Sequence, residues 1–164
     1  MLYYSLGLIT GFYKTNNYFT LYGLENFIIP TISIIILKEY FRSLICNKYD
    51  DSKILYVVTF IMFVMLDLIN MVKPVLLVSV ERMFFFVAVT LLPAISNNIT
   101  ANYIAKNSNY KVNVFWLLVL NLYVYLLPII PNVGEYILSV IKLILPILIF
   151  YKVKMFFEKE KDHE

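Results

Sequence analysis

Long runs of apolar residues alternate with short polar stretches along this chain. Runs that are long enough to cross a hydrocarbon core lie at about 21–37, 54–72, 75–95, 113–130 and 136–152. A transmembrane helix needs about 17–25 mainly apolar residues, and a helix that is apolar on every side belongs in lipid or in a large protein core. The pattern therefore predicts an all-α fold, a polytopic transmembrane helix bundle with about five spans.

The last two runs form a predicted helical hairpin over residues 112–153. The sequence Pro128-Ile-Ile-Pro131-Asn-Val-Gly134 separates them. Proline interrupts a helix because it lacks an N–H donor and its ring clashes with the preceding turn, and glycine permits a turn. We therefore expect Pro128, Pro131 and Gly134 to form a helical-hairpin corner.

The predicted organisation has three parts. Residues 1–20 form a short apolar N-terminal segment, which is either interfacial or the end of a longer helix. Residues 21–153 form the transmembrane helical domain, and residues 154–164 form a charged cytoplasmic tail whose last residues we expect to be disordered. Gly7 and Gly11 match a small-xxx-small helix-packing pattern, although two incidental glycines are the simpler interpretation.

Composition favours an integral membrane protein. Hydrophobic residues make up 61% of the 164 residues and the mean hydropathy is +0.77, whereas an average soluble domain is about 45–50% apolar. The single cysteine, Cys46, cannot form an internal disulfide, and no Cys/His cluster indicates a metal or another cofactor. The lysines lie in short loops rather than on one basic face, so we expect the lipid bilayer, and no nucleic acid, as a partner.

Lysine and arginine placement predicts the orientation. The loop 38–53, the polar connector 96–111 and the tail carry most of the basic residues, whereas the corner 131–135 carries none. Short cytoplasmic loops are enriched in Lys and Arg. The chain is therefore expected to be a multi-pass protein of the cell membrane, with its N-terminus outside and its C-terminus cytoplasmic.

Polar residues at membrane depth are costly and are candidates for function. Asp67 and Lys142 lie at similar predicted depths and could pair, as a proton or substrate relay or, in the interpretation we favour, as a structural ion pair or a snorkelling lysine. Asn121 is expected to hydrogen-bond a neighbouring helix. Glu81, next to Arg82, is expected at the membrane interface.

The residue pattern predicts no catalytic residue. His163 is the only histidine and lies in the predicted tail, so a Ser-His-Asp site has no base. No Gly-x-Ser-x-Gly nucleophile motif occurs. The sequence Asn98-Ile-Thr100 matches a glycosylation site, but the predicted topology places it inside, where it would not be used.

The C-terminal part resembles a known family. The Tyr-rich apolar segment, the sequence Leu127-Pro128-Ile-Ile-Pro131-Asn-Val-Gly134 and the following apolar segment with Pro146 are similar to the membrane-embedded N-terminal region of certain signal peptidases. These are the Gram-positive signal peptidase I proteins of the archaeal and endoplasmic-reticulum type. The more diffuse opening at 21–70 also fits that region.

The resemblance implies a non-catalytic role for this chain. In that family a further helix leads to an extracytoplasmic protease domain whose nucleophile is the serine of a Ser-Met pair, and this chain has no Ser-Met pair. The implied function is to anchor or position signal-peptide processing, with a downstream serine protease domain or signal-bearing preproteins as partners. The alternative is a small membrane transporter or channel subunit that uses Asp67 and Lys142.

Overall fold

The chain folds into helices with one short pair of strands. The computed structural model describes residues 2–15, 20–48, 53–69 and 79–161. It divides into two compact units, of which the first comprises 1–41 with 110–134 and the second 42–109 with 135–164. Both units draw residues from the predicted domain 21–153. The predominance of helix over the described residues confirms the all-α prediction.

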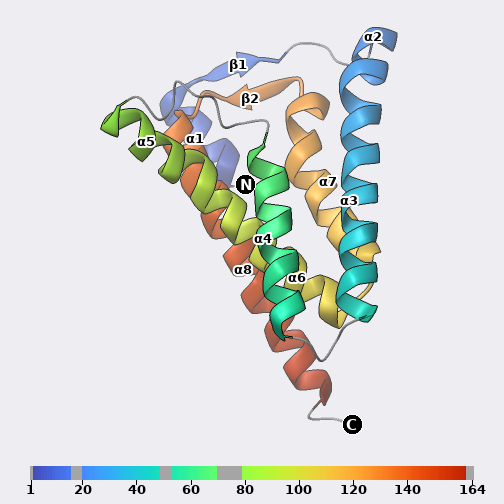
Figure 1. Ribbon diagram of the computed structural model, residues 1–164. Coiled ribbons are helices and arrows are strands. Elements are labelled where there is room, and N and C mark those ends of the chain that lie inside the picture. Colours follow the sequence, from blue (N-terminus) through green and yellow to red (C-terminus); the bar gives the residue numbers. More distant parts are fainter. Residues whose placement is uncertain (1, 16–19, 49–52, 70–78, 162–164) are drawn as a thin grey trace. The chain divides into compact units, whose positions relative to one another are not determined.

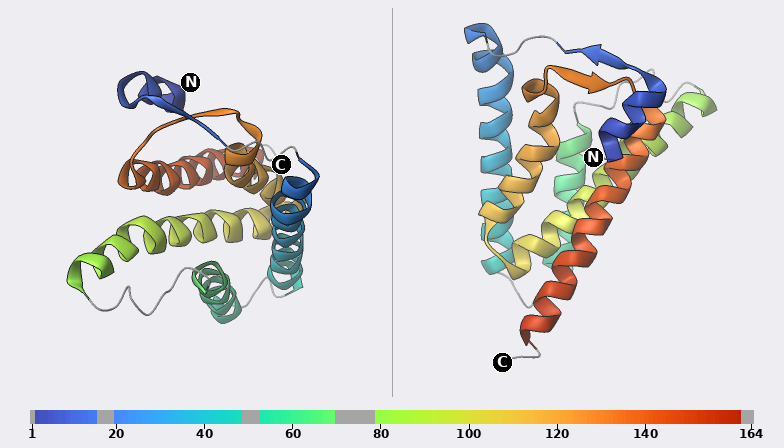
Figure 2. Two further views of the ribbon diagram at one scale, coloured as in Figure 1. Left: turned by 90° about the horizontal axis from the view of Figure 1, so that it is seen from above. Right: turned by 180° about the vertical axis from the view of Figure 1, so that it is seen from behind.

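The second unit is built around two helical segments that run side by side. One joins α5 (Val80–Phe86), a π-helical turn η3 (Val87–Leu91) and α6 (Leu92–Asn107), and the other is α8 (Glu135–Lys161). Their contacts advance together, from Phe85 with Tyr136 to Tyr103 with Phe150. The two segments are therefore parallel, as Figures 1 and 2 show. Helix α4 (Lys53–Leu68) packs against α6.

Hydroxyl side chains hold these parallel helices together. Ser96 and Thr100, one turn apart on α6, donate to the carbonyls of Leu143 and Pro146 on α8 at 2.8 and 2.9 Å. Ser139 donates to the Val89 carbonyl at 3.4 Å. Because Pro93 lacks the N–H that a regular helix would bring to that carbonyl, the neighbouring helix supplies a donor instead.

The first unit combines two long helices with the strand pair. Helix α2 (Leu21–Gly23), a π-helical turn η1 (Leu24–Ile28) and α3 (Ile29–Lys48) form one continuous helical segment, which enters the second unit after Phe41. The unit also holds α1 (Leu2–Thr10), β1 (Phe12–Lys14), α7 (Tyr110–Leu126) and β2 (Ile129–Pro131). The strands are antiparallel, with Tyr13 opposite Ile130 (Figure 1).

The two N-terminal glycines form a helix-to-strand turn. The Gly11 N–H donates to the Gly7 carbonyl at 2.8 Å, and Gly11 has a φ of 83°, which L side chains rarely adopt. At Gly7 a Cβ would lie 2.3 Å from the Phe12 ring. The pair is therefore neither incidental nor a helix-packing motif, because Gly11 turns the chain from α1 into β1 and Gly7 leaves room for the Phe12 ring.

Within the described residues, three helical segments are long and apolar enough to cross a membrane, namely Leu21–Lys48, Val80–Asn107 and Glu135–Lys159. They correspond to the predicted spans 21–37, 75–95 and 136–152, and each is longer than predicted. Together they support a membrane location. The exposed aliphatic and aromatic side chains along them suit contact with lipid.

Several helices end at other residues than the predicted apolar spans. Helix α3 continues to Lys48, two residues beyond Cys46, where an amphipathic extension of the first span could end. Helix α6 occupies most of the connector 96–111, of which only a part around Tyr103 was considered helical. Helix α7 ends at Leu126 because Pro128 and the strand β2 follow it. The predicted tail is helical to Lys161, with an ion pair between Lys154 and Glu158.

Some predictions concern residues outside the described part of the chain. These are the ends of two predicted spans at 70–72 and 75–78, the charged positions Asp50 and Asp51, and the tail residue His163. They stay predictions.

The Gly11 turn yields a testable prediction. Gly11→Ala should lower the free energy of unfolding by about 1–2 kcal/mol, because alanine is strained at positive φ. Gly134→Ala is the matched control, since no atom lies within 4 Å of its added Cβ and its φ is not in the left-handed region. Fluorescence of Trp116, the only tryptophan, can follow unfolding in micelles. Equal stability of the two variants would contradict the assigned turn.

Candidate functional site: a buried arginine cluster

A buried group of charged and amide side chains lies in the second unit. Its members come from three helices, and we call them the arginine cluster: Arg42 from α3, Phe63 and Asp67 from α4, and Asn98 and Asn102 from α6. The two asparagines are four residues apart, so the helix places them on one face, one turn from each other. This spacing matches the fork of a guanidinium group.

Hydrogen bonds connect the cluster from cation to anion. Arg42 donates from Nη1 to the side-chain oxygen of Asn102, and from Nη2 to that of Asn98 at 2.7 Å. Asn98 Nδ2 donates to Asp67 Oδ2 at 2.6 Å and to the Ala94 carbonyl at 2.8 Å. Asn98 therefore accepts from the cation and donates to the anion.

The guanidinium group also stacks on an aromatic ring. Arg42 Cζ lies 4.1 Å from the centroid of the Phe63 ring, which is itself buried. Cation–π contacts of this kind strengthen when the cation is shielded from water. Arg42 and Asn98 are each 1% exposed and Asn102 is fully buried. The cluster thus holds a full positive charge inside the protein, and Asp67 brings the compensating negative charge.

The chemistry available in the cluster is charge balance and hydrogen bonding. It has no hydroxyl or thiol nucleophile beside a base, and its one carboxylate, Asp67, accepts a hydrogen bond from Asn98. Nor do three His, Cys, Asp or Glu side chains meet at a metal-binding geometry anywhere in the part of the chain that the structure describes. Hydrogen bonds that link buried groups of opposite charge on different helices constrain how those helices pack.

A second polar group lies in the first unit, between α3 and α7. Asn113 Nδ2 donates to Glu39 Oε2 at 3.0 Å, and Trp116 Nε1 donates to Asn113 Oδ1 at 3.1 Å. Glu39 and Asn113 are fully buried. Next to them the Tyr40 and Tyr110 rings meet edge to face, with centroids 5.5 Å apart. Glu39 and Arg42 were both predicted in a solvated loop, and the structure corrects this.

The predicted corner is closed by a strand. Thr15 donates from its N–H to the Pro128 carbonyl at 3.0 Å and from its hydroxyl to the Leu127 carbonyl at 2.5 Å. Beyond β2, the Asn132 N–H donates to the Gly11 carbonyl at 2.9 Å. The corner is therefore held by the N-terminal segment through hydrogen bonds on both sides of β2. Whether α7 and α8 pack as a hairpin stays a prediction, since they belong to different units.

The predicted site residues have separate environments. Asp67 joins the arginine cluster, whereas Lys142 lies exposed on α8, and no ion pair links the two among the described residues. Asn121 donates to the Leu117 carbonyl of its own helix at 2.7 Å rather than to a neighbouring helix. Glu81 is exposed in the first turn of α5, where Ser79 caps the helix.

Arg42, Asn98 and Asn102 were not predicted from the sequence as members of a buried cluster. A signal was present: Arg42 and Ser43 lie on the same helical stripe as the buried Ile35, Glu39 and Cys46, with the spacing of one helix face. An amphipathic continuation of the first span to Cys46 is open from the sequence, but its charged residues were assigned to solvent rather than to the buried face. The buried Asn98 also leaves the sequence Asn98-Ile-Thr100 without a free amide for glycosylation.

Comparisons with known proteins identify no relative. No protein-family model matches the sequence, and no curated protein or solved structure matches it significantly.

The arginine cluster predicts unequal effects for two matched substitutions. Asn98→Leu should lower the free energy of unfolding by about 3 kcal/mol, because it removes one hydrogen bond to a cation and another to an anion, each typically about 1.5–3 kcal/mol. Asn121→Leu should change it by less than about 0.5 kcal/mol, because Asn121 is exposed and bonds only its own helix. Unfolding followed by far-UV circular dichroism in micelles would measure both, and similar losses would contradict the bridging role of Asn98.

Proposed function

We propose that this chain is a non-catalytic membrane domain that anchors or positions signal-peptide processing. The observation that supports the proposal most is that hydrogen bonds hold the corner from Leu127 to Gly134 in place. This segment carries the resemblance to signal peptidases. Its strand β2 is hydrogen-bonded to β1 and flanked by the bonds from Thr15 and Asn132. A fixed platform of this kind, at the end of an apolar helix, suits a positioning role better than a loose turn does.

The proposed topology has five crossings, with the N-terminus outside and the C-terminus cytoplasmic. Helices α4 and α7 supply the two crossings beyond the three long apolar segments, and their 16 and 17 residues correspond to about 24–26 Å of helix at 1.5 Å per residue. The parallel packing of Val80–Asn107 with α8 supports this order, because one intervening crossing leaves the flanking crossings in the same direction.

The buried charges refine the orientation argument. Arg42 bonds Asn98 and Asn102 inside the protein, so it does not act as a charge in a cytoplasmic loop. Lys48 is exposed at the end of α3, and Lys152, Lys154 and Lys159 are exposed on α8. These residues keep the basic excess on the proposed cytoplasmic side.

The arginine cluster fits a scaffold. Its hydrogen bonds join α3, α4 and α6 and leave the lipid-facing sides of these helices apolar. The alternative function, a small transporter or channel subunit, would need Asp67 and Lys142 to act together. Because Asp67 accepts from Asn98 while Lys142 is exposed on another helix, we do not propose transport.

Photo-crosslinking to a defined preprotein tests the proposal. A photoreactive phenylalanine analogue would replace Phe115 of α7 or Leu148 of α8, which are 72% and 59% exposed. In membranes that contain a radiolabelled preprotein, we expect adducts to its signal segment. A single-span protein with no signal sequence should give several-fold less adduct, because a positioning domain distinguishes its client from other helices.

The analogue at Phe156 provides a matched control. This residue is 65% exposed but lies in the predicted tail, beyond the proposed membrane span. We expect little signal-segment adduct there. Equal yields for the preprotein and the single-span protein at Phe115 and Leu148 would refute the proposed function.

A further inference from the structure

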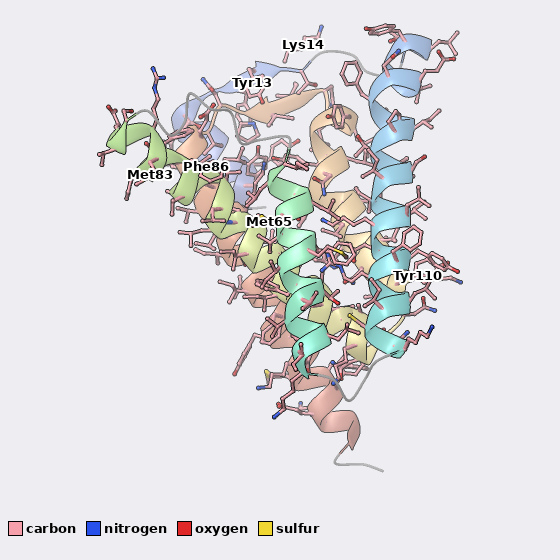
Figure 3. The ribbon with its side chains drawn as sticks, viewed as in Figure 1. Tyr13, Lys14, Met65, Met83, Phe86 and Tyr110 are labelled. Carbon is pink, nitrogen blue, oxygen red and sulfur yellow. The ribbon has the colours of Figure 1, made fainter. Side chains whose placement is uncertain are left out.

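The two outer edges of the strand pair differ. A two-stranded antiparallel sheet has one free edge on each strand, and each edge presents backbone N–H and C=O groups that lack a strand partner. Among the residues that the structure describes, local bonds close the β2 edge, and none reaches the outward groups of β1. Figure 3 shows Tyr13 and Lys14 on β1.

Local groups close the edge of β2. Pro131 has no N–H to donate, and its carbonyl accepts from the Val133 N–H at 2.9 Å. The Ile129 carbonyl accepts from the Tyr4 hydroxyl at 3.0 Å. An incoming strand would find little to pair with on this side.

The edge of β1 is open at Phe12 and Lys14. The Gly11 carbonyl and the Thr15 N–H form hydrogen bonds on the side of β1 that faces β2. Alternate residues of an antiparallel strand direct their backbone groups to the same side, so the N–H and C=O of Tyr13 also face β2. The N–H and C=O groups of Phe12 and Lys14 therefore point outward, and no hydrogen bond reaches them from any residue that the structure describes. All three side chains of β1 are exposed.

The chemistry of this edge selects its partner. Outward N–H and C=O groups on alternate residues match the backbone of an extended peptide, which adds as a strand. Lys14 is the only charged side chain on either strand, so a carboxylate on the incoming segment complements it. Because β2 begins three residues after α7 ends at Leu126, a segment on this sheet would lie where an apolar helix leaves the membrane.

We infer that the open edge of β1 binds an extended, carboxylate-bearing segment that adjoins the membrane helix of a client protein. The segment pairs its backbone with Phe12 and Lys14 and places its carboxylate near the Lys14 ammonium group. This inference rests on the proposed function, since it names how the domain would hold the part of a preprotein next to its signal helix.

Disulfide scanning tests the inference in the full chain. Cys46→Ser removes the only cysteine, and Tyr13→Cys introduces one between the two outward residues. The probe is a single-span preprotein whose signal helix is followed by alternating Thr and Val with one Asp, and a series of probes carries one cysteine at successive positions. Position 13 and the probe residue opposite it would form a non-hydrogen-bonded pair. The short Cα separation of such a pair suits a disulfide.

We expect cross-links at alternate probe positions, because side chains of a strand alternate between its two faces. Lys14→Pro removes one outward N–H and leaves the bonds of β1 to β2 in place, so the yield should fall by at least about tenfold. Lys14→Gln should lower the yield less and keep the alternation. Amide protection at Thr15 would verify that the Lys14→Pro variant retains the strand pair. Replacing alternate probe residues by Pro tests the same bonds with the protein unchanged.

Three outcomes would overturn the inference. In the first, cross-links spread evenly along the probe. That even pattern is the one expected from random collisions, and a cysteine at the exposed Ile9 measures it as a control. In the second, cross-links persist when alternate probe residues are Pro. A Tyr13→Cys disulfide between two copies without probe would show that a second copy covers the edge. If these results coincide with signal-segment adducts at Phe115 and Leu148, the proposed function stands and only the β1 site fails.

Discussion

The hydrogen-bonded bridge from Arg42 through Asn98 to Asp67 is the constraint on which the second unit depends. A charge in apolar surroundings is tolerated only when a partner and hydrogen bonds compensate it. Because these groups come from α3, α4 and α6, the helices cannot shift without exposing a charge to lipid. Apolar packing alone would leave such helices free to slide, since lipid chains are as apolar as leucine side chains.

The sequence was sufficient for the fold class and for the long helices. The apolar runs identified the three segments that are long and apolar enough to cross a membrane, and the prolines marked where α7 ends. Burial was predicted poorly where polar residues were taken to face solvent, because Glu39, Arg42 and Asn98 are polar but buried. Hydropathy averages over residue types, whereas burial depends on which polar groups find partners in three dimensions.

The candidate site was only partly predictable for the same reason. Asp67 was identified from its depth alone, but its partner is an amide from a stretch that looked like a connector, and no local pattern joins residues 31 positions apart. The strand pair was also missed, because β1 and β2 have three residues each. The proline corner was recognised as a break, although its pairing with an N-terminal segment leaves no signal in hydropathy.

The chain order of the second unit has a consequence for biogenesis. Its parallel helices are separated by residues 110–134 of the first unit, so Ser96 and Thr100 leave the ribosome well before their acceptors at Leu143 and Pro146. Until α8 is made, Thr100 can keep its 3.1 Å bond to the Ser96 carbonyl of its own helix, whereas the bond from Ser96 to the Leu143 carbonyl can form only afterwards. The two interhelical bonds therefore form late, and the packing of α6 against α8 can be completed only when residues 135–146 are in place.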